Sequence, residues 1–289
     1  MEDLSPKIIL GTVQMGIPYG INNSTGKITE EESHGLLDTA FKKGIRLLDT
    51  ATAYGNAIDV IGNYHRASSN RFNICCKFQL AGAEEKFETN FMNCLERLHI
   101  DSFFCYEYHR INDLAIKNVA EKLASFKKER LLTSIGVSVY TADEIRQAIE
   151  TPLIDIIQFP YNVLDNFTQK GLLLKAAHQK GKVLHARSVF LQGLFFKPIE
   201  LFPPGLEALK EPVRKLNTIA QKYDLPLNSL ALLYVAQNPL INGVLIGVDS
   251  REQLLLNLEL LRKRLAPEVL QEIEAIAIAE TSLLNPTLW

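Results

Sequence analysis

Short apolar runs alternate with amphipathic stretches along almost the whole chain, and this alternation restricts the fold more than any other feature. Eight runs have the length and composition of strands: residues 7–12, 46–50, 72–78, 102–108, 133–139, 154–159, 182–187 and 242–248. They are largely apolar rather than strictly alternating, which is typical of parallel strands covered on both faces. The intervening stretches have helical periodicity, as in residues 30–44, 85–99, 113–130 and 167–181. We therefore predict an α/β fold, a (β/α)8 TIM barrel.

The length and charge of the chain narrow the possible functions. Its 289 residues slightly exceed the roughly 250 of a typical barrel, so we predict one domain spanning residues 1–289. A formal net charge of −2 gives no electrostatic reason to expect nucleic acid or an anionic membrane surface as a partner. No apolar run approaches the roughly 18 residues that a membrane-spanning helix needs. The acidic N-terminus enters a strand almost at once, unlike a signal peptide, and we expect a cytoplasmic protein.

The four cysteines and six histidines form no recognisable metal-binding pattern. Cys75, Cys76, Cys94 and Cys105 contain no C-x-x-C pair, and no two histidines have a cysteine or carboxylate at ligand spacing. Cys75 and Cys76 are strand neighbours whose side chains point to opposite faces, which disfavours a disulfide between them. We expect buried, reduced thiols and no metal.

One connection is much longer than the others. The loop at about 188–205 separates the seventh strand from the next helical stretch, and its later part contains Pro198, Pro203, Pro204 and Gly205. These residues disfavour regular structure. A long loop at the active face of a barrel is more often a lid or a cofactor clasp than a linker, so we expect this loop to cover a bound molecule.

Four ionisable residues lie near the ends of three successive predicted strands: Asp49, Tyr54, Lys77 and His109. The carboxyl ends of all strands of a barrel meet at one mouth, so these side chains are expected to gather there. A phenol has a pKa of about 10, which burial alone would raise, so a tyrosine needs a nearby cation to donate a proton near neutral pH. Lys77 supplies that charge, and Asp49 holds the lysine in place. Each residue alone has a purely structural explanation, but together they predict a proton-donating site in which the cation lowers the pKa of the phenol.

These residues belong to longer matching segments. They are G-T at Gly11–Thr12, D-T-A-x-x-Y-G from Asp49 to Gly55, Lys77, and R-L at Arg97–Leu98 followed eleven residues later by His109. In these segments the sequence resembles the aldo-keto reductases, nearly from end to end. The resemblance implies NAD(P)H-dependent reduction of an aldehyde or ketone to an alcohol, in which Tyr54 donates the proton, His109 orients the substrate oxygen and a nicotinamide supplies the hydride. The usual aspartate of the fourth strand is replaced by Phe104, whereas the usual tyrosine is matched by Tyr106.

No G-x-G-x-x-G motif follows a strand, so the sequence gives no sign of a Rossmann nucleotide site. The resemblance implies instead that a nicotinamide nucleotide lies extended across the barrel mouth. The positions implied to bind it are Gly11, Thr12, Ser138, Gln158, Arg187, Ser188, Leu191, Gly193, Gly247, Ser250, Arg251, Gln253 and Asn257. This chain departs from the family pattern at Val139, where an asparagine is usual, and in lacking the proline usual in the segment 188–193.

The residue before Ser250 bears on the choice between the two nicotinamide cofactors. Many NADP-preferring members of the resembled family carry a basic residue there, which neutralises the 2′-phosphate, whereas this chain has Asp249. NADP(H) is the family default and NAD(H) is the hypothesis that Asp249 motivates. Arg251 would compensate for Asp249 if its side chain turned inward.

Three interpretations of the site remain open at this point. The main one predicts a small-molecule carbonyl substrate. The second is a nicotinamide-nucleotide-binding regulatory protein or subunit with weak or no catalysis, whose protein partner the sequence does not identify. The third is a lyase or isomerase with Lys77 as a Schiff-base amine, which leaves Tyr54 unexplained. The C-terminal tail 281–289 either borders the substrate pocket, as the resemblance implies, or is a frayed terminus.

Overall fold

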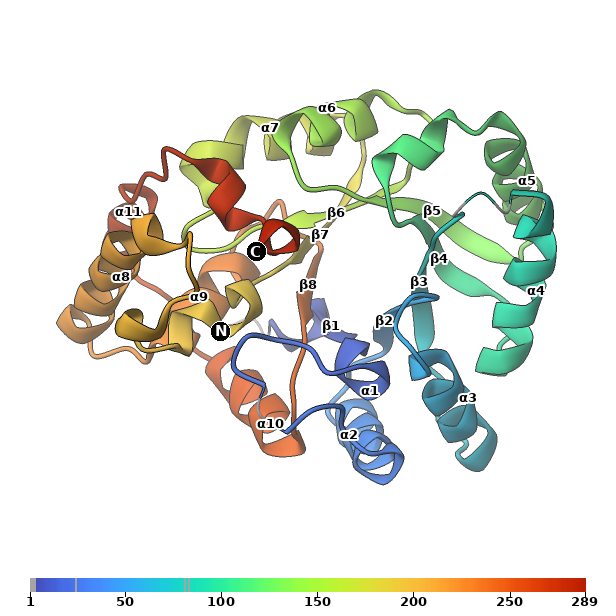
Figure 1. Cartoon of the computed structure of the whole chain (residues 1–289), viewed down its shortest axis with the longest axis horizontal. Helices are drawn as coiled ribbons and strands as arrows, with labels where there is room; N and C mark the ends of the chain where they lie inside the picture. Colours follow the sequence, from blue (N-terminus) through green and yellow to red (C-terminus); the bar gives the residue numbers. More distant parts are fainter. Residues whose placement is uncertain (1–3, 24, 81, 83) are drawn as a thin grey trace.

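Eight parallel strands close into a barrel in the order of the sequence, with the last strand pairing with the first (Figure 1). This computed structural model describes residues 4–23, 25–80, 82 and 84–289. The strands are β1 (Ile8–Gly11), β2 (Leu47–Ala51), β3 (Asn73–Phe78), β4 (Phe103–Tyr108), β5 (Leu132–Ser138), β6 (Ile156–Pro160), β7 (Val183–Arg187) and β8 (Gly243–Ile246). Each overlaps one of the eight predicted runs, so the predicted fold class is confirmed.

Helices surround the barrel and connect successive strands (Figure 1). They are α1 (Val13–Gly16), α2 (Glu30–Lys42), α3 (Ala57–Ala67), α4 (Phe87–Leu98), α5 (Lys117–Lys128), α6 (Ala142–Glu150), α7 (Phe167–Gln179), α8 (Lys210–Lys222), α9 (Leu227–Ala236), α10 (Arg251–Leu260) and α11 (Pro267–Glu274). Short 3-10 helices occupy Ser5–Lys7, Glu84–Lys86, Ile111–Ala115, Leu191–Phe196, Ile199–Leu201, Glu207–Leu209, Thr281–Leu284 and Pro286–Leu288. No helix among the described residues is long and apolar enough to cross a membrane.

Local sequence determines where several of these helices begin. At the start of α2 the Thr29 hydroxyl accepts a hydrogen bond from the backbone N–H of Glu32, and the Glu32 carboxylate accepts one from the N–H of Thr29. Thr141 and Glu144 form the same capping box at the start of α6. Each box satisfies backbone donors that the first helical turn leaves free, which stabilises a helix by about 1 kcal/mol.

The apolar core lies mainly between the strands and the surrounding helices, whereas the inside of the barrel is partly polar. A small apolar cluster inside the barrel contains Cys75, Cys105 and Ile156. Alternate residues of a strand share a face, so the positions two residues beyond Cys75 and Cys105 also point inward. These positions are Lys77 and Glu107, both fully buried. The interior therefore changes from apolar to charged along the strands.

The four cysteines are buried and free, as predicted. The loop at 188–205 contains two short 3-10 helices, Leu191–Phe196 and Ile199–Leu201, and no longer regular structure. The tail folds into two more, and its Trp289 indole donates a hydrogen bond to the backbone oxygen of Leu283 at 3.1 Å.

Candidate active site

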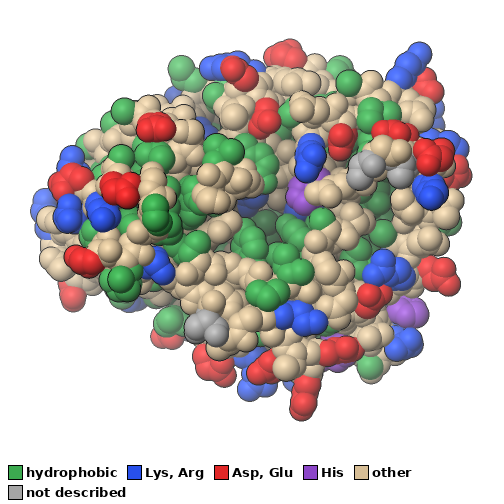
Figure 2. All heavy atoms as spheres, in the orientation of Figure 1, with side chains coloured by type: hydrophobic (Ala, Val, Ile, Leu, Met, Phe, Trp, Pro, Cys, Tyr) green, Lys and Arg blue, Asp and Glu red, His purple; other side chains and the backbone are tan. Residues whose placement is uncertain are grey.

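A cavity of about 600 Å³ lies at the end of the barrel where the strands finish. Figure 2 shows the molecule hollowed near the middle of the view, with hydrophobic side chains around the hollow. Most of the predicted site residues line the cavity: Gly11, Thr12, Asp49, Tyr54, Lys77, His109, Ser138, Gln158, Arg187, Ser188, Gly193, Gly247, Gln253 and Asn257. No described residue of the tail 281–289 lines it.

Three of the predicted cofactor-binding residues do not line the cavity. Leu191 is buried in the core instead. The Ser250 hydroxyl caps α10 by accepting a hydrogen bond from the N–H of Gln253 at 3.2 Å. Arg251 extends toward α2, where its Cδ lies 3.6 Å from the position that a Cβ on Gly35 would occupy. The side chain of Arg251 therefore lies against α2 and does not line the cavity.

A buried ion pair joins the ends of β2 and β3. The Lys77 ammonium contacts the Asp49 carboxylate, and both side chains are almost fully shielded from solvent. The other Asp49 oxygen accepts a hydrogen bond from the Gln158 amide on β6 at 2.7 Å. A buried pair of this kind is costly unless its remaining hydrogen-bonding groups are satisfied, and Gln158 satisfies one of them.

Two glycines hold Tyr54 beside this pair. A Cβ on Gly16, at the end of α1, would lie 1.7 Å from the backbone oxygen of Tyr54. Gly55 has a φ of +52°, which favours glycine, and its own Cβ would lie 2.4 Å from the oxygen of Gly16. The two backbones therefore touch at a distance that no larger residue permits. This contact places the Tyr54 ring with its centroid 5.4 Å from the Lys77 Nζ.

Opposing effects determine the acidity of Tyr54 and Lys77. Burial raises the pKa of the Tyr54 phenol to about 12, although the Lys77 charge acts in the opposite direction. The lowering effect expected of the Lys77 cation is present, as is the raising effect expected of burial, and burial is the larger of the two. Burial also acts to lower the pKa of Lys77, but the negative charge of Asp49, followed by those of Tyr54 and Glu107, outweighs burial and raises it. Tyr54 is therefore protonated and Lys77 charged at neutral pH.

His109 completes the group from the end of β4. Its ring lies perpendicular to that of Tyr54, with centroids 6.3 Å apart. Burial, with help from the Lys77 charge, lowers the pKa of His109 to about 4, so the ring is neutral at pH 7. The Gln79 amide nitrogen lies 3.3 Å from Nδ1. Because an amide nitrogen donates, Nδ1 accepts, and the single ring proton is left on Nε2.

Two buried residues were missed by the sequence analysis. Glu107 on β4 and His185 on β7 are almost completely buried inside the barrel near Asp49 and Lys77. Their spacing in the sequence could have identified them: Glu107 precedes His109 by two residues, and His185 precedes Arg187 by two. Residues two positions apart in a strand share a face, so a titratable residue at this spacing is expected to point to the same side as the site residue. Burial lowers the pKa of His185 to about 4.

The interior also brings together three groups of a kind that can bind metals. One ligand atom each of Cys75, Cys105 and Glu107 lies within 4.8 Å of the others. The sequence spacing predicted no metal site, and strand pairing rather than spacing creates this group. Burial raises the pKa of both thiols, which disfavours the thiolates that a metal would require.

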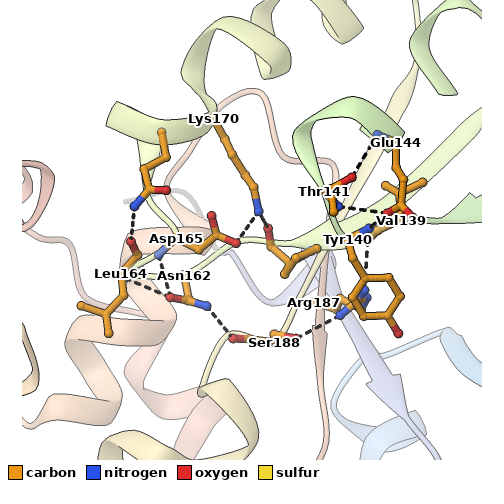
Figure 3. Close-up of polar contacts among 12 residues, drawn as sticks. Val139, Tyr140, Thr141, Glu144, Asn162, Leu164, Asp165, Lys170, Arg187 and Ser188 are labelled. Atoms are coloured by element: carbon orange, nitrogen blue, oxygen red, sulfur yellow. Dashed lines mark hydrogen bonds and ion pairs between the residues drawn. The ribbon is translucent and has the colours of Figure 1, made fainter. Parts of the chain in front are cut away.

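Hydrogen bonds tie together the loops that follow β5, β6 and β7 (Figure 3). The Arg187 guanidinium donates to the Val139 oxygen at 3.0 Å and lies 4.0 Å from the centroid of the Tyr140 ring. The Asn162 amide donates to the Ser188 oxygen at 3.1 Å. Arg187 is thus fixed as a cation at the cavity wall and has no carboxylate partner among the described residues.

The first loop (residues 17–29) and the seventh loop (residues 188–206) also contact each other at the cavity. The Asn22 amide donates to the Gly193 oxygen at 2.6 Å, and the Ile21 N–H donates to the Gln192 oxygen at 3.2 Å. The Gln192 amide donates to the Tyr19 hydroxyl at 3.0 Å. These contacts join the two loops into one wall.

A sequence model of the aldo/keto reductase family matches residues 7–278. The chain belongs to this family. Its members are oxidoreductases that act on carbonyl compounds and generally bind nicotinamide cofactors.

Individual proteins are similar to this chain along most of its length. Protein tas of Escherichia coli (strain K12) is 22% identical over 333 residues, which cover 92% of this chain and 94% of that protein. The NADH-specific methylglyoxal reductase of the same strain is 25% identical over 255 residues, covering 74% of this chain and 78% of the relative. The holo form of an aldo-keto reductase from Bacillus halodurans superposes with a TM-score of 0.76 at 20% identity, covering 95% of this chain and 93% of that one. The structural likeness shows the shared fold.

Proposed function

We propose that this aldo-keto reductase reduces an aldehyde or ketone to an alcohol, with Tyr54 as the proton donor. The observation that carries the proposal is the buried Asp49–Lys77 pair beside the Tyr54 ring, with the neutral His109 ring edge-on to the same phenol. All four residues line one cavity. A cation beside a phenol stabilises the phenolate that proton donation leaves behind.

The cavity fits a nicotinamide nucleotide. Gln14 and Gln158, which both line the cavity, each have a buried side-chain oxygen without a hydrogen-bond partner among the described residues. Such oxygens accept from N–H donors, and the carboxamide of a nicotinamide offers them. Gln158 and Ser138 would hold that group, while Gln253 and Asn257 would hold the opposite end of the nucleotide. The bound cofactor would supply hydride.

The remaining chemistry belongs to residues of the chain. The Tyr54 hydroxyl donates its proton to the oxygen of the substrate carbonyl as negative charge develops there. Lys77 stabilises the resulting phenolate, and Asp49 keeps the ammonium in place. The Nε2–H of His109 donates a hydrogen bond to the same oxygen and orients it. Because His109 is neutral above about pH 4, it can act in this way throughout the neutral range.

We further propose a preference for NADH over NADPH. Among the described residues, the Lys and Arg side chains that line the cavity are Lys77 of β3 and Arg187 of β7, whereas Asp249 follows β8. Arg251 points toward α2 and leaves the Asp249 carboxylate uncompensated. A 2′-phosphate bound beside this carboxylate would be repelled. One of the similar proteins bears the name NADH-specific methylglyoxal reductase, which accords with this preference.

The direct test compares Tyr54→Phe with the unaltered protein on a panel of aldehydes and ketones, with NADH and with NADPH. The expected result is a loss of turnover of at least about a hundredfold, since the general acid is removed. Cofactor affinity should be retained, because only a hydroxyl is lost. Turnover that persists in Tyr54→Phe would contradict the assignment of the proton donor.

The same experiment distinguishes the proposed reductase from a regulatory nucleotide-binding protein. A nucleotide-sensing protein would bind the cofactor tightly and show negligible turnover on every carbonyl tested, with and without the Tyr54 hydroxyl. Turnover by the unaltered protein that the mutation abolishes is the result expected of the reductase.

A further inference from the structure

A second buried carboxylate flanks the catalytic lysine. Glu107 on β4 pairs in register with Lys77 on β3, and both side chains point into the barrel. Lys77 therefore lies between Asp49 on one neighbouring strand and Glu107 on the other. No solvent reaches the Glu107 side chain, whose relative exposure is 0%.

One amide connects the two carboxylates. Nε2 of Gln158 donates to Asp49 at 2.7 Å and lies 3.3 Å from Oε2 of Glu107. The other Glu107 oxygen, Oε1, has no partner among the described residues. Burying an ionised carboxylate costs free energy unless several hydrogen-bond donors surround it, whereas a protonated carboxyl group needs fewer such donors.

The fold makes room for this carboxylate. A Cβ on Gly136 of β5 would lie 2.6 Å from Cγ of Glu107 and 2.8 Å from Sγ of Cys105. Any larger residue at 136 would displace the glutamate. The glycine at position 136 therefore provides the space that the Glu107 side chain occupies.

We propose that Glu107 is a positioning residue that sets how much of the Lys77 charge remains available to Tyr54. When Glu107 is neutral, Asp49 alone compensates Lys77, and the ammonium stabilises the Tyr54 phenolate strongly. When Glu107 is ionised, two carboxylates share one ammonium and proton donation weakens. The effect of Glu107 on the reaction rests on the proposed function. The effect of the Glu107 charge on Lys77, which we call the electrostatic link, does not require turnover.

Glu107 changes charge in the neutral pH range, whereas the groups that face it do not. Burial raises the pKa of Glu107 to about 7, with Lys77 acting to lower it and Asp49 to raise it. Burial also raises the pKa of Cys75 and Cys105, which face it from β3 and its own strand, so both stay neutral thiols. Lys77 stays charged, while Gly136 and Gln158, which face it from β5 and β6, do not titrate.

The two histidines that face the ion pair do not titrate in this range either. The pKa of His109 and of His185 is lowered to about 4, primarily by burial. A change in the cluster near neutral pH is therefore attributable to Glu107.

The test observes Lys77 directly in the full-length, cofactor-free protein. The chemical shift of its Nζ is followed by NMR in protein labelled with ¹⁵N-lysine, between about pH 5.5 and 8.5, with Lys77→Arg to assign the signal. The expected result is a single step with a midpoint near neutral pH. Glu107→Gln, which keeps the shape and removes the charge, should abolish the step, and Glu107→Asp, which keeps a carboxyl group, should restore one with a different midpoint.

Two outcomes would overturn the inference. The first is a Lys77 signal that does not change with pH in the unaltered protein, and the second is a step that persists in Glu107→Gln. If Glu107→Gln does not fold, the presence or absence of the step in the unaltered protein and in Glu107→Asp still decides the question.

A second arm measures the rate of carbonyl reduction at saturating cofactor across the same pH range. The rate of the unaltered protein should fall about threefold to tenfold as Glu107 ionises, and the rate of Glu107→Gln should not. A fall that survives in Glu107→Gln would contradict the proposed effect on Tyr54. Absence of turnover in every variant, with the Lys77 step intact, would instead contradict the proposed reductase function and leave the electrostatic link standing.

Discussion

Charge compensation around single residues determines most of what this site can do. Lys77 is compensated by Asp49, whereas Arg187 at the cavity wall and Asp249 at its far end have no ionic partner among the described residues. Asp249 donates its backbone N–H to Gln253 at 2.9 Å, and the Asn23 amide lies 3.5 Å from its carboxylate. An uncompensated charge in a binding cavity selects ligands by repulsion as well as by attraction.

The first prediction at this scale concerns the two cofactors. NADH should bind the unaltered protein about tenfold more tightly than NADPH, because Asp249 repels the 2′-phosphate. Asp249→Arg should reverse the order. Dissociation constants from quenching of the intrinsic protein fluorescence would measure both. Glu252→Gln is the matched control, since it removes an exposed carboxylate of α10 that does not line the cavity. At least tenfold tighter binding of NADPH to the unaltered protein would contradict the prediction.

Sequence reasoning could place Asp49, Tyr54, Lys77 and His109 together because each follows or ends a recognisable apolar run. It could not give the direction of the Arg251 side chain, which depends on the packing of α10 against α2. Nor did it give the net pKa of Tyr54, because two large effects of opposite sign depend on the depth of burial.

At the scale of elements, the short helix α1 and the loop after β2 act as one unit. The close approach of Gly16 to the Tyr54 backbone fixes the height of the phenol above Lys77. The apolar runs predicted the strands well, because burial on both faces leaves a clear pattern. They did not predict α1, whose four residues are too few for a helical period to be visible.

Gly16→Ala should therefore impair the reaction without touching any reacting group. The added methyl group would lie 1.7 Å from the backbone oxygen of Tyr54, so the loop that carries Tyr54 must shift by a distance comparable to a bond length. A displacement of about 1 Å can cost about a hundredfold in rate, so we expect kcat to fall by at least about tenfold.

Gly35→Ala in α2 is the control for Gly16→Ala. Its methyl group would meet Arg251 at an ordinary contact distance of 3.6 Å, and alanine favours the helix by about 1 kcal/mol. Gly35→Ala should therefore keep full activity, and its Tm should be slightly higher than that of the unaltered protein. Equal activity of the two variants would show that the Gly16 contact does not position Tyr54.

At the scale of the whole molecule, the barrel carries a buried titratable cluster in its centre. In the folded state the pKa of Glu107 is about 7, above its ordinary value of 4.5. A raised pKa means that the folded state binds the proton more tightly than the unfolded state does. The resulting stabilisation is complete below about pH 4.5 and is lost as the pH rises through about 7.

The final prediction follows from this linkage. Relative to the unaltered protein, Glu107→Gln should gain about 1 to 3 kcal/mol in the free energy of unfolding between pH 5 and pH 8, because the amide cannot ionise. Urea unfolding at several pH values would measure the difference. Contributions from His109 and His185 are present in both proteins and cancel. A difference between the two proteins that does not change with pH would contradict the linkage.

The space that Gly136 leaves for Glu107 has a consequence for the ancestry of this chain. A side chain gained at position 136 would expel the glutamate, and a smaller residue at position 107 would leave a void opposite the glycine. Either change alone is penalised, so the two positions are expected to be inherited as a pair. Among homologous sequences, a carboxylate at position 107 should accompany glycine at position 136, and sequences that lack one of the two residues should also lack the other.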